Sequence, residues 1–433
     1  MSRIYSYIIL FLSALALAYC IYRDIRLERQ HPGDLPNRVI GARLQKDGIS
    51  PYFYGWDSTQ PMRYYDPSGY HTIAASNVTA SPFFHQLLYP IADLPQRTFS
   101  RVWLLIQYLV WAAMLGMVIS FTNTSRQKLL ILVIGTTFLF TRFWVDTVLK
   151  GQNYFLIGLF FLVITLLLTR PGRLLSMLIA GGLMAGVVLI KPTAVFFFPP
   201  FLFIWKQWPV KSRLSLLAGS LLVIVSAFAS GESRYYWLEY RHALNEHIKL
   251  HQRLQPDSGQ KALFNRHLNY EGWDMDLSDS AALSYRYKFR GENSNIFVLY
   301  EEIFKRRLPV AWMLGLCIVV ISALLLFYYR IVVLPDGFTL VQAALLGVCM
   351  YIIADLFSPI HRFTYNGAPW LAAFLAIGWY KRLPYIAYIL LTIALFLQVT
   401  IRYIMPMQYS IGEYLILISF LIIAIQKPSE LRA

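Results

Sequence analysis

The chain has 433 residues, of which 57% are hydrophobic and only 14% are charged. Soluble globular proteins carry about 25% charged residues, so the composition excludes an ordinary soluble domain and indicates a protein with several membrane spans. The formal net charge of +16 does not require a nucleic-acid partner, because Lys and Arg collect in the cytoplasmic loops of membrane proteins and set their topology. No basic–aromatic pattern typical of nucleic-acid binding accompanies the charge.

The first apolar run extends from Ile4 to Tyr22 and follows Arg3. It is long for the hydrophobic region of a signal peptide, and no small-residue cleavage site follows it. An uncleaved first membrane helix is therefore the better interpretation.

A membrane-spanning helix needs about 20 mostly apolar residues. Applied along the chain, this rule predicts an all-α polytopic membrane protein with about twelve transmembrane helices. The predicted helices lie near residues 4–22, 101–121, 129–147, 153–169, 174–190, 193–206, 214–230, 309–329, 336–355, 364–380, 384–404 and 410–426. The segment 193–206 is short for a span.

The distribution of basic residues favours cytoplasmic N- and C-termini. With this orientation every short cytoplasmic turn contains Lys or Arg, as the positive-inside rule requires. Two long segments, 23–100 and 231–308, then lie on the outer face. Each contains a pattern typical of an amphipathic helix, at 36–48 and at 234–254. We expect residues 1–433 to form a single integral domain in a membrane of the bacterial inner-membrane type, with the first outer segment as its catalytic loop.

The first outer segment places several ionisable residues directly after the first membrane helix. Asp34 follows a Pro-Gly turn at a position typical of a helix N-cap, and Arg38 and Arg43 come after it. Capping explains a single Asp, but a carboxylate with cationic neighbours at the membrane boundary also suits a general base or an anion site. These residues leave both interpretations open, and Asp57 is a second candidate carboxylate.

Four further polar clusters fall on the same predicted face. Each has a structural alternative, namely interfacial packing by aromatics and prolines, snorkelling of a lysine, or an isolated structural histidine. Lys191 interrupts an apolar stretch, and a Lys at membrane depth costs roughly 2.5–3.5 kcal/mol on insertion scales, so it needs a partner or a function. The other polar residues of these clusters are Tyr89, Asp146, Lys150, Gln152, Asn153, Asp355, His361, Arg362, Tyr365 and Asn366. Their shared face is the strongest indication of a site.

Together these motifs resemble the multi-spanning GT-C glycosyltransferases, and among them glycosyltransferase family 87, the polyprenol-phosphate-mannose-dependent mannosyltransferases. The matching features follow the order of the family and cover most of the chain. They are Asp34 with a short helix and then Gly48, Pro51 and Tyr52; Tyr89-Pro90 and Leu94-Pro95; Gly151-Gln152-Asn153; Ala180-Gly181 through Lys191-Pro192; Asn293-Ser294-Asn295; and Ser358-Pro359 with His361. The family usually has one residue between the Gln and the Asn, which are adjacent here.

The resemblance implies a GT-C-like fold and an inverting sugar transfer on the outer membrane face. The donor it implies is a hexose or pentose, mannose-like in the first instance, linked to a polyprenyl phosphate, and the acceptor is a lipid or glycan of the cell envelope. Asp34 corresponds to the family's catalytic base. An ionised phosphate leaving group needs cations rather than a general acid. The candidates for binding it, or other parts of the substrate, are Lys191, Arg362, His361, Arg38, Arg43, Gln152 and Asn153, and the secondary site candidates are Asp57, Tyr89, Tyr365 and Asn366.

Neither a metal nor another cofactor is expected. The cysteines all lie in apolar runs, which favours small core residues over disulfides or a thiolate metal site. They are Cys20, Cys317 and Cys349. An Asp-x-Asp pattern at 274–276 lacks an accompanying nucleotide-binding domain and is interpreted as part of a solvated acidic loop. The expected partners are the lipid-linked donor, the acceptor and membrane lipids, without nucleic acid.

A polysaccharide polymerase, an O-antigen ligase or a flippase for lipid-linked saccharides is the alternative function. Such proteins also combine many membrane spans with large outer loops. A transporter, however, should place ionisable residues at mid-membrane and often shows inverted repeats, and neither feature is visible in this sequence. A ligase or polymerase would depend on outer-loop Arg and His without needing an early Asp.

Overall fold

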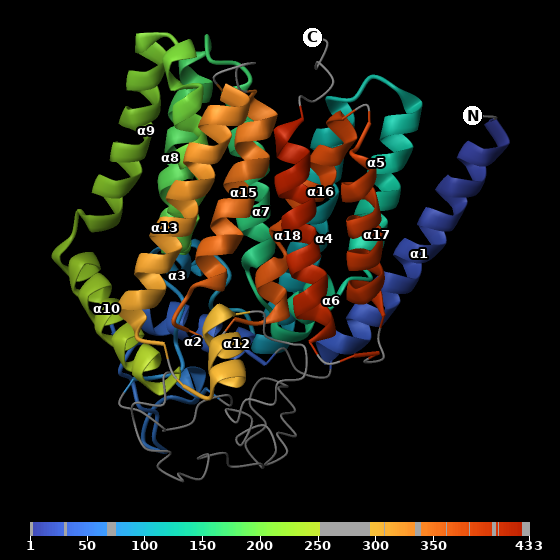
Figure 1. The fold of residues 1–433 in the computed structure, drawn as a ribbon. Helices are drawn as coiled ribbons and strands as arrows, with labels where there is room; N and C mark the ends of the chain where they lie inside the picture. The colour runs from blue at the N-terminus through green and yellow to red at the C-terminus, as the bar shows by residue number, and fades with distance from the viewer. Residues whose placement is uncertain are drawn as a thin grey trace.

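The computed structural model describes most of the chain. The described stretches are residues 3–29, 33–66, 75–251, 295–306, 308–333, 339–360, 362–380, 382–400, 404–405 and 407–426. Their secondary structure is helical throughout (Figure 1), which confirms the all-α prediction. His361, the Asp-x-Asp pattern at 274–276 and most of the second predicted outer segment lie outside these stretches.

Most of the helices are α-helices. In chain order they are α1 (Arg3–Arg29), α2 (Leu35–Lys46), α3 (Pro82–Leu88), α4 (Gln96–Ser120), α5 (Ser125–Phe138), α6 (Arg142–Lys150), α7 (Tyr154–Leu168), α8 (Leu174–Ile190), α9 (Val210–Phe228), α10 (Gly231–His251), α12 (Ile296–Phe304), α13 (Val310–Tyr328), α15 (Leu340–Leu356), α16 (Trp370–Ala376), α17 (Tyr385–Val399) and α18 (Gln408–Ile425). Short helices of other types are η1 (Met62–Tyr64), η2 (Pro192–Phe197), η3 (Pro199–Phe203), η4 (Trp205–Gln207), the π-helical η5 (Tyr329–Val333), η6 (Thr364–Gly367) and η7 (Ile377–Trp379).

In the described part of the chain, five helices are long and apolar enough to cross a membrane. They are α1, α4, α9, α13 continued by η5, and α18. The consecutive helices α5 and α6 make a sixth candidate, bent by 53° at their junction. The protein is therefore a polytopic membrane protein. The predicted total of about twelve spans is supported only in part, because α7, α8, α15 and α17 have 15 to 17 residues, fewer than the about 20 that a bilayer core requires.

The predicted span at 364–380 is not a single helix. It consists of η6, the seven-residue α16 and η7, and every residue from Thr364 to Tyr380 is buried. The segment packs against α5, α7 and α15. An element that is apolar on all sides is buried inside protein as readily as in lipid, so its composition alone could not separate these two environments.

The predicted short span at 193–206 forms three consecutive 3₁₀-helices, η2 to η4. They connect α8 to α9, and these two helices run parallel. The orientation follows from two hydrogen bonds: Ser215 of α9 donates to the carbonyl of Leu174 (2.7 Å), and Ser220, further along α9, donates to that of Gly181 (2.9 Å), further along α8. A 3₁₀-helix rises about 2.0 Å per residue, against 1.5 Å in an α-helix. The short segment can therefore return along the bundle and bring α9 back beside α8.

The first helix extends past its predicted end at Tyr22 and reaches Arg29. Asp24 is fully buried within it, and its carboxylate accepts hydrogen bonds from the Tyr108 hydroxyl (2.7 Å) and from Trp144 Nε1 (2.7 Å). Because these partners satisfy the buried charge, Asp24 does not end the helix. The segment predicted to be the first outer one therefore begins after Arg29 and not at residue 23.

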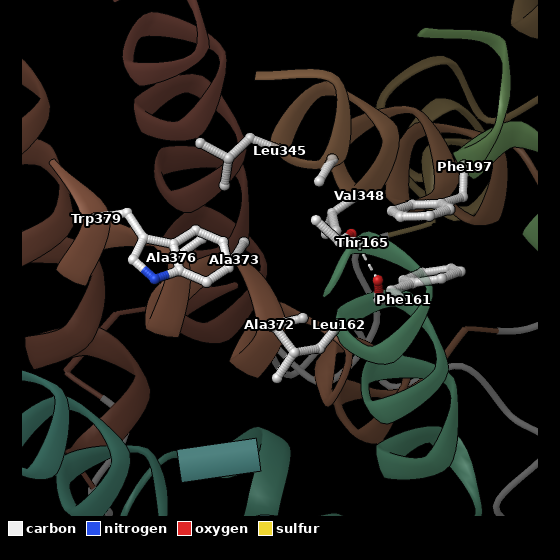
Figure 2. A pocket seen from close by; sticks show the side chains of 11 residues that line it. Phe161, Leu162, Thr165, Phe197, Leu345, Val348, Ala372, Ala373, Ala376 and Trp379 are labelled. Atoms are coloured by element: carbon white, nitrogen blue, oxygen red, sulfur yellow. Dashed lines mark hydrogen bonds between the residues drawn. The ribbon is translucent and has the colours of Figure 1, made fainter. Parts of the chain in front are cut away.

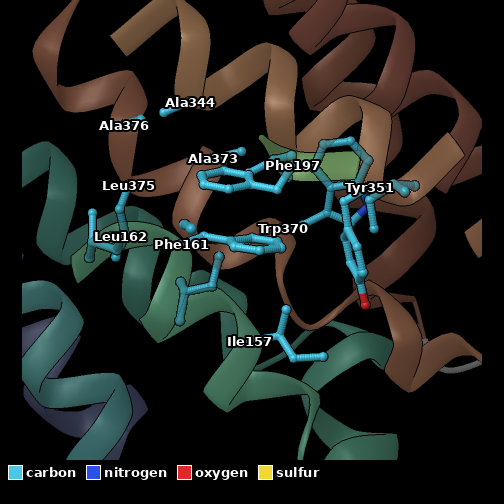
Figure 3. Packing of buried hydrophobic residues seen from close by; sticks show 14 of the residues in the cluster. Ile157, Phe161, Leu162, Phe197, Ala344, Tyr351, Trp370, Ala373, Leu375 and Ala376 are labelled. Atoms are coloured by element: carbon cyan, nitrogen blue, oxygen red, sulfur yellow. The ribbon is translucent and has the colours of Figure 1, made fainter. Parts of the chain in front are cut away.

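The core is centred on α15, which is buried along almost its whole length. Phe161 of α7 stacks on Phe197 of η2 with ring centroids 4.0 Å apart, and Tyr351 of α15 meets Phe161 edge-on at 5.2 Å (Figure 3). The helices α1, α9 and α13 expose many large apolar side chains, as lipid-facing helices do. The three cysteines are buried and free, which confirms their assignment to the core.

The helices α2, α3, α6, α10 and α12 gather at one end of the bundle, opposite to the start of α1 and the end of α18 (Figure 1). The predicted helix at 36–48 is confirmed as α2, but it is not amphipathic, because every residue from Leu35 to Gln45 is buried. The predicted helix at 234–254 corresponds to α10, which is described as far as His251. It is amphipathic, and its buried stripe consists of Ser233, Tyr236, Tyr240, Ala243 and His247.

Candidate active site

Asp34 directly precedes α2 and is bound by the turn between α6 and α7. The backbone N–H of Gly33 donates to the carbonyl of Leu149 (3.2 Å), and that of Asp34 donates to the carbonyl of Lys150 (3.1 Å). Gly151 ends α6 in the left-handed conformation, with a φ of 62°, which glycine adopts without steric cost. This glycine turns the chain so that the following residue can reach the Asp34 side chain.

The carboxylate of Asp34 is hydrogen-bonded from the same turn. Gln152 donates from Nε2 to Asp34 Oδ2, and Arg38 donates to Gln152 Oε1 (2.6 Å) and to the backbone carbonyl of Asp34 (2.5 Å). We call these three residues the Asp34 cluster. Asp34 occupies the N-cap position of α2, yet its side chain makes no capping hydrogen bond. Capping therefore does not explain its carboxylate.

Two tyrosines lie beside the Asp34 cluster. The rings of Tyr154 and Tyr365 are 5.5 Å apart. Burial raises the pKa of the Tyr365 hydroxyl well above its ordinary value, and the negative charge of Asp34 raises it further, so Tyr365 stays protonated. The helix that contains Tyr365, η6, is attached to α6 because Thr364 donates a hydrogen bond to Asp146. The η6 segment, late in the chain, and Asp34, early in the chain, thus lie close together.

Lys191 lies where α8 ends, and its ammonium has two partners. Nζ donates to the Tyr154 hydroxyl (2.9 Å) and lies 3.3 Å from Oδ1 of Asp355 in α15. The Lys191 side chain is 26% exposed, whereas that of Asp355 is 1% exposed. Lys191 is therefore a partly accessible cation anchored on a buried carboxylate, and Tyr154 connects it to the surroundings of Asp34.

Arg362 is completely buried and is matched by two carboxylates. Its Nε donates to Asp355 Oδ2 (2.6 Å), and its two Nη atoms donate to the carboxylate of Glu413 in α18, one of them at 2.6 Å. Asn366 donates to the same oxygen of Asp355 (2.9 Å), and Trp370 donates to Glu413 (3.0 Å). This arrangement anchors Asp355 and joins α15, η6 and α18.

Arg43 also makes internal contacts. Its buried guanidinium donates to the backbone carbonyls of Ala92 (2.8 Å), Leu94 (2.7 Å) and Arg63 (3.0 Å). These bonds attach α2 to the turn that leads into α4 and to η1. Arg43 therefore fixes the place of α2, on which Arg38 is carried.

Two secondary candidates have partners elsewhere in the described structure. Asp57 is exposed, and its Oδ1 accepts hydrogen bonds from the hydroxyl (2.5 Å) and the backbone N–H (2.8 Å) of Thr59, which lower the carboxyl pKa. Tyr89 follows α3 near Gln45 and Glu232, and burial raises the pKa of its hydroxyl to about 12. Neither residue forms a hydrogen bond with the Asp34 cluster.

Residues 79–359, more than half of the chain, match the sequence model of glycosyltransferase family 87. The chain belongs to glycosyltransferase family 87. It is a membrane glycosyltransferase, as its motifs predict. Neither the comparison with curated proteins nor that with solved structures finds a match, so the GT-C-like architecture stays a prediction. The matched region contains Gln152, Asn153 and Lys191, whereas Asp34 precedes it.

One contact of the glycosyltransferase joins two of its motifs. Asn295, which caps α12 by accepting from the backbone N–H of Phe297 (2.7 Å), also donates to the carbonyls of Ser358 (2.7 Å) and Ile360 (3.0 Å). The start of α12 is thereby attached to the Ser-Pro turn after α15. This turn leads to Arg362 and on to Tyr365 beside Asp34.

Sequence reasoning did not identify two side chains that complete contacts of the candidate site. Tyr154 and Glu413 complete the Lys191 and Arg362 contacts described above. Glu413 interrupts an apolar helix, and an acidic residue in such a segment requires a partner, so this signal was available. Lys150 packs against Gly33, where an added Cβ would lie 3.4 Å from Nζ. Its ammonium has no hydrogen-bond or ion-pair partner among the described residues, and the Asn153 side chain likewise makes no capping bond.

The described part of the glycosyltransferase contains no group of three or more His, Cys, Asp or Glu side chains placed to hold a metal. A small cavity lies in the core between α7, α15 and α16 (Figure 2), lined by residues that include Phe161, Leu162, Val348 and Trp379. Its lining is apolar except for Thr165, whose hydroxyl donates to the carbonyl of Phe161 (2.7 Å). The cavity offers no group for chemistry and is a feature of core packing.

Proposed function

We propose that the protein transfers a hexose or pentose, mannose-like in the first instance, from a polyprenyl phosphate to a hydroxyl of a lipid or glycan acceptor. The transfer takes place on the outer membrane face with inversion of the anomeric centre. The observation that carries the proposal is the environment of Asp34, a half-buried carboxylate. One of its oxygens is fixed by Gln152, and the other, Oδ1, has no hydrogen bond among the described residues.

In the proposed reaction Asp34 is the general base. Its Oδ1 accepts the proton of the acceptor hydroxyl while that oxygen bonds to the anomeric carbon. The bond between the anomeric carbon and the phosphate oxygen breaks in the same step, and its electron pair leaves with the lipid phosphate. A single displacement of this kind inverts the configuration and needs no covalent enzyme intermediate.

The lipid phosphate gains negative charge as it leaves, and fixed cations stabilise that charge. We assign this function to Lys191, because its side chain is partly exposed while Tyr154 and Asp355 hold its ammonium in place. Lys150 is the second cation of the site. His361 stays a phosphate-binding candidate. The scheme requires no metal, because the leaving group is a single phosphate that is already ionised.

The other predicted site residues have supporting functions in this proposal. Arg362 and Asn366 fix the carboxylate of Asp355, and Arg43 fixes α2. Asn153 and Tyr365 are the polar side chains near Asp34 that we assign to substrate hydroxyls. Asp57 and Tyr89 are given no catalytic step.

The proposed donor class is tested by offering the purified protein, in nanodiscs with a membrane lipid extract as acceptor source, three labelled donors. These are a polyprenyl-phosphate mannose, a nucleotide-linked mannose and a polyprenyl-diphosphate oligosaccharide. We expect transfer of one sugar from the monophosphate donor only, unchanged by a metal chelator. En bloc transfer from the diphosphate donor would show a ligase or polymerase instead. Movement of an intact lipid-linked saccharide across proteoliposomes, without transfer, would show a flippase.

A further inference from the structure

The Asp34 cluster is a closed ring of hydrogen bonds. Arg38 Nη1 donates to the Asp34 carbonyl and Arg38 Nη2 to Gln152 Oε1, while Gln152 Nε2 donates to Asp34 Oδ2. A glutamine amide has one acceptor oxygen and one donor nitrogen. Because Arg38 can only donate, it fixes the oxygen end of the amide and directs the nitrogen end at Asp34.

The two residues behind the carboxylate are more deeply buried than the carboxylate itself. Gln152 is 1% exposed and Arg38 is 7% exposed, whereas Asp34 is half-buried. The backbone of Gln152 is fixed by a hydrogen bond from its N–H to the carbonyl of Thr147 (2.9 Å). A buried and fully oriented donor therefore lies on one side of Asp34, and no described residue bonds to Oδ1.

We infer that Gln152 and Arg38 are positioning residues that orient the Asp34 carboxylate so that Oδ1 is the atom that takes the proton. This inference rests on the proposed function, and it changes the predicted function of both residues from binding substrate to acting through Asp34. The ring holds Oδ2 against Gln152 and leaves Oδ1 as the oxygen of Asp34 that can face an acceptor hydroxyl. Neither Gln152 nor Arg38 touches the reacting atoms in this scheme.

The test is the pH dependence of transfer by Gln152→Glu. The new carboxylate has nearly the same size and still accepts from Arg38, so the turn is retained, but it no longer donates to Asp34. We expect kcat to fall at least about tenfold while KM for polyprenyl-phosphate mannose changes less than about threefold. We also expect the acidic limb of the pH profile of kcat/KM to move to higher pH by about one unit.

The matched control is Gln342→Glu. Gln342 is also fully buried, and its Oε1 accepts from the backbone N–H of Thr339 (2.9 Å) while its Nε2 donates to the carbonyl of Ala424 (3.2 Å). The exchange therefore removes a buried amide donor here too, but in the first turn of α15 and not beside Asp34. Its pH profile should superimpose on that of the unaltered protein. If Gln152→Glu does not fold, as judged by size-exclusion chromatography, Gln152→Met replaces it with the same expected shift in pH.

A Gln152 variant whose acidic limb stays in place, or whose defect lies in KM alone, would overturn the inference. That outcome is distinguishable from failure of the proposed function. If Asp34→Asn abolishes transfer while the Gln152 variants leave the pH profile unchanged, only the positioning inference is wrong. If Asp34→Asn retains transfer, the proposed base itself is wrong.

Discussion

At the scale of single residues, Lys191 and Arg362 share Asp355 but differ in their availability to a ligand. The Arg362 side chain is 0% exposed, and two carboxylates match its guanidinium. Lys191 keeps part of its surface open. Removing one partner of a buried ion pair is destabilising when it leaves an uncompensated charge. Without Lys191, Asp355 still has Arg362 and Asn366, so a substitution of Lys191 tests binding rather than folding.

We predict that Lys191→Met lowers kcat/KM for the polyprenyl-phosphate donor by at least about a hundredfold, because an electrostatic donor to the leaving group is lost. The control is Lys46→Met, which removes an exposed lysine paired with Asp93 and should cost less than about threefold, since exposed pairs contribute little. Steady-state kinetics on both variants checks this. Equal losses of kcat/KM in the two variants would show that Lys191 does not stabilise the leaving phosphate.

His85 gives the fold a predicted dependence on pH. It is fully buried in α3, and burial lowers its pKa to about 3, with the charge of Arg38 acting in the same direction. An unfolded His has a pKa of about 6.5, so between these values only the unfolded state binds the proton. Above about pH 6.5, His85 is neutral in both states and its protonation does not lower the free energy of unfolding. As the pH falls from there towards 3, that free energy decreases by up to roughly 1.4 kcal/mol per pH unit.

We therefore expect the melting temperature of the unaltered protein to fall more steeply than that of His85→Gln between about pH 7 and about pH 5. Differential scanning fluorimetry in detergent measures both curves. Parallel curves would show that His85 is protonated equally easily in the folded and unfolded states.

The sequence indicated most of the charged site residues but not which of their charges are already matched. Asp34 and Lys191 were singled out because a charge near an apolar segment needs an explanation, and that argument requires no neighbours. The separate functions of Arg38, Arg43 and Arg362 depend on acceptors far along the chain, such as Gln152, Ala92 and Glu413. Only the fold brings these acceptors into contact with the arginines.

At the scale of elements, α8 and α9 pack unusually closely. A Cβ added to Gly181 would lie 1.9 Å from the carbonyl oxygen of Leu216, and one added to Gly219 would lie 1.9 Å from that of Leu178. Two glycines thus let the helix backbones touch, as small residues do in membrane proteins.

We predict that Gly181→Ala destabilises the protein by about 1–3 kcal/mol, because the clash is with backbone that cannot move aside cheaply. Gly116→Ala is the matched control, since nothing lies within 4 Å of a Cβ added at Gly116, which lies inside α4 near its C-terminal end. Ala is the better helix former there, so its melting temperature should be unchanged or higher. Thermal unfolding of both variants in detergent decides the matter, and equal melting temperatures would contradict the packing argument.

Most element positions followed from apolar runs, and the exceptions have physical causes. The α2 prediction was correct in place but not in environment, because burial of its polar face depends on the turns that cover it. The apolar runs at 193–206 and 364–380 predict membrane-spanning helices, since apolar composition does not distinguish a 3₁₀ return or a buried broken helix from a span. The periodicity of apolar residues predicts that a segment is helical more securely than it predicts whether the helix lies in lipid or inside the protein.

At the scale of the whole molecule, the candidate site lies at the end of the bundle opposite to the start of α1 and the end of α18 (Figure 1). The positive-inside pattern leads us to predict that this end is the outer one. Single cysteines at exposed positions report it, because the native cysteines are buried. In intact cells a membrane-impermeant maleimide should label Ser58→Cys, whereas Gly172→Cys should react only after permeabilisation. The reverse pattern would place the site in the cytoplasm.

The central claim is that Asp34 takes the proton in sugar transfer, and single-turnover transfer by Asp34→Asn tests it most directly. The substitution keeps size and shape but removes the base. Labelled polyprenyl-phosphate mannose should bind with a Kd within about threefold of the unaltered protein, while transfer slows by about 10²–10⁴-fold. Asp57→Asn should retain both binding and transfer. Near-normal transfer by Asp34→Asn, or loss of transfer in Asp57→Asn instead, would contradict the account.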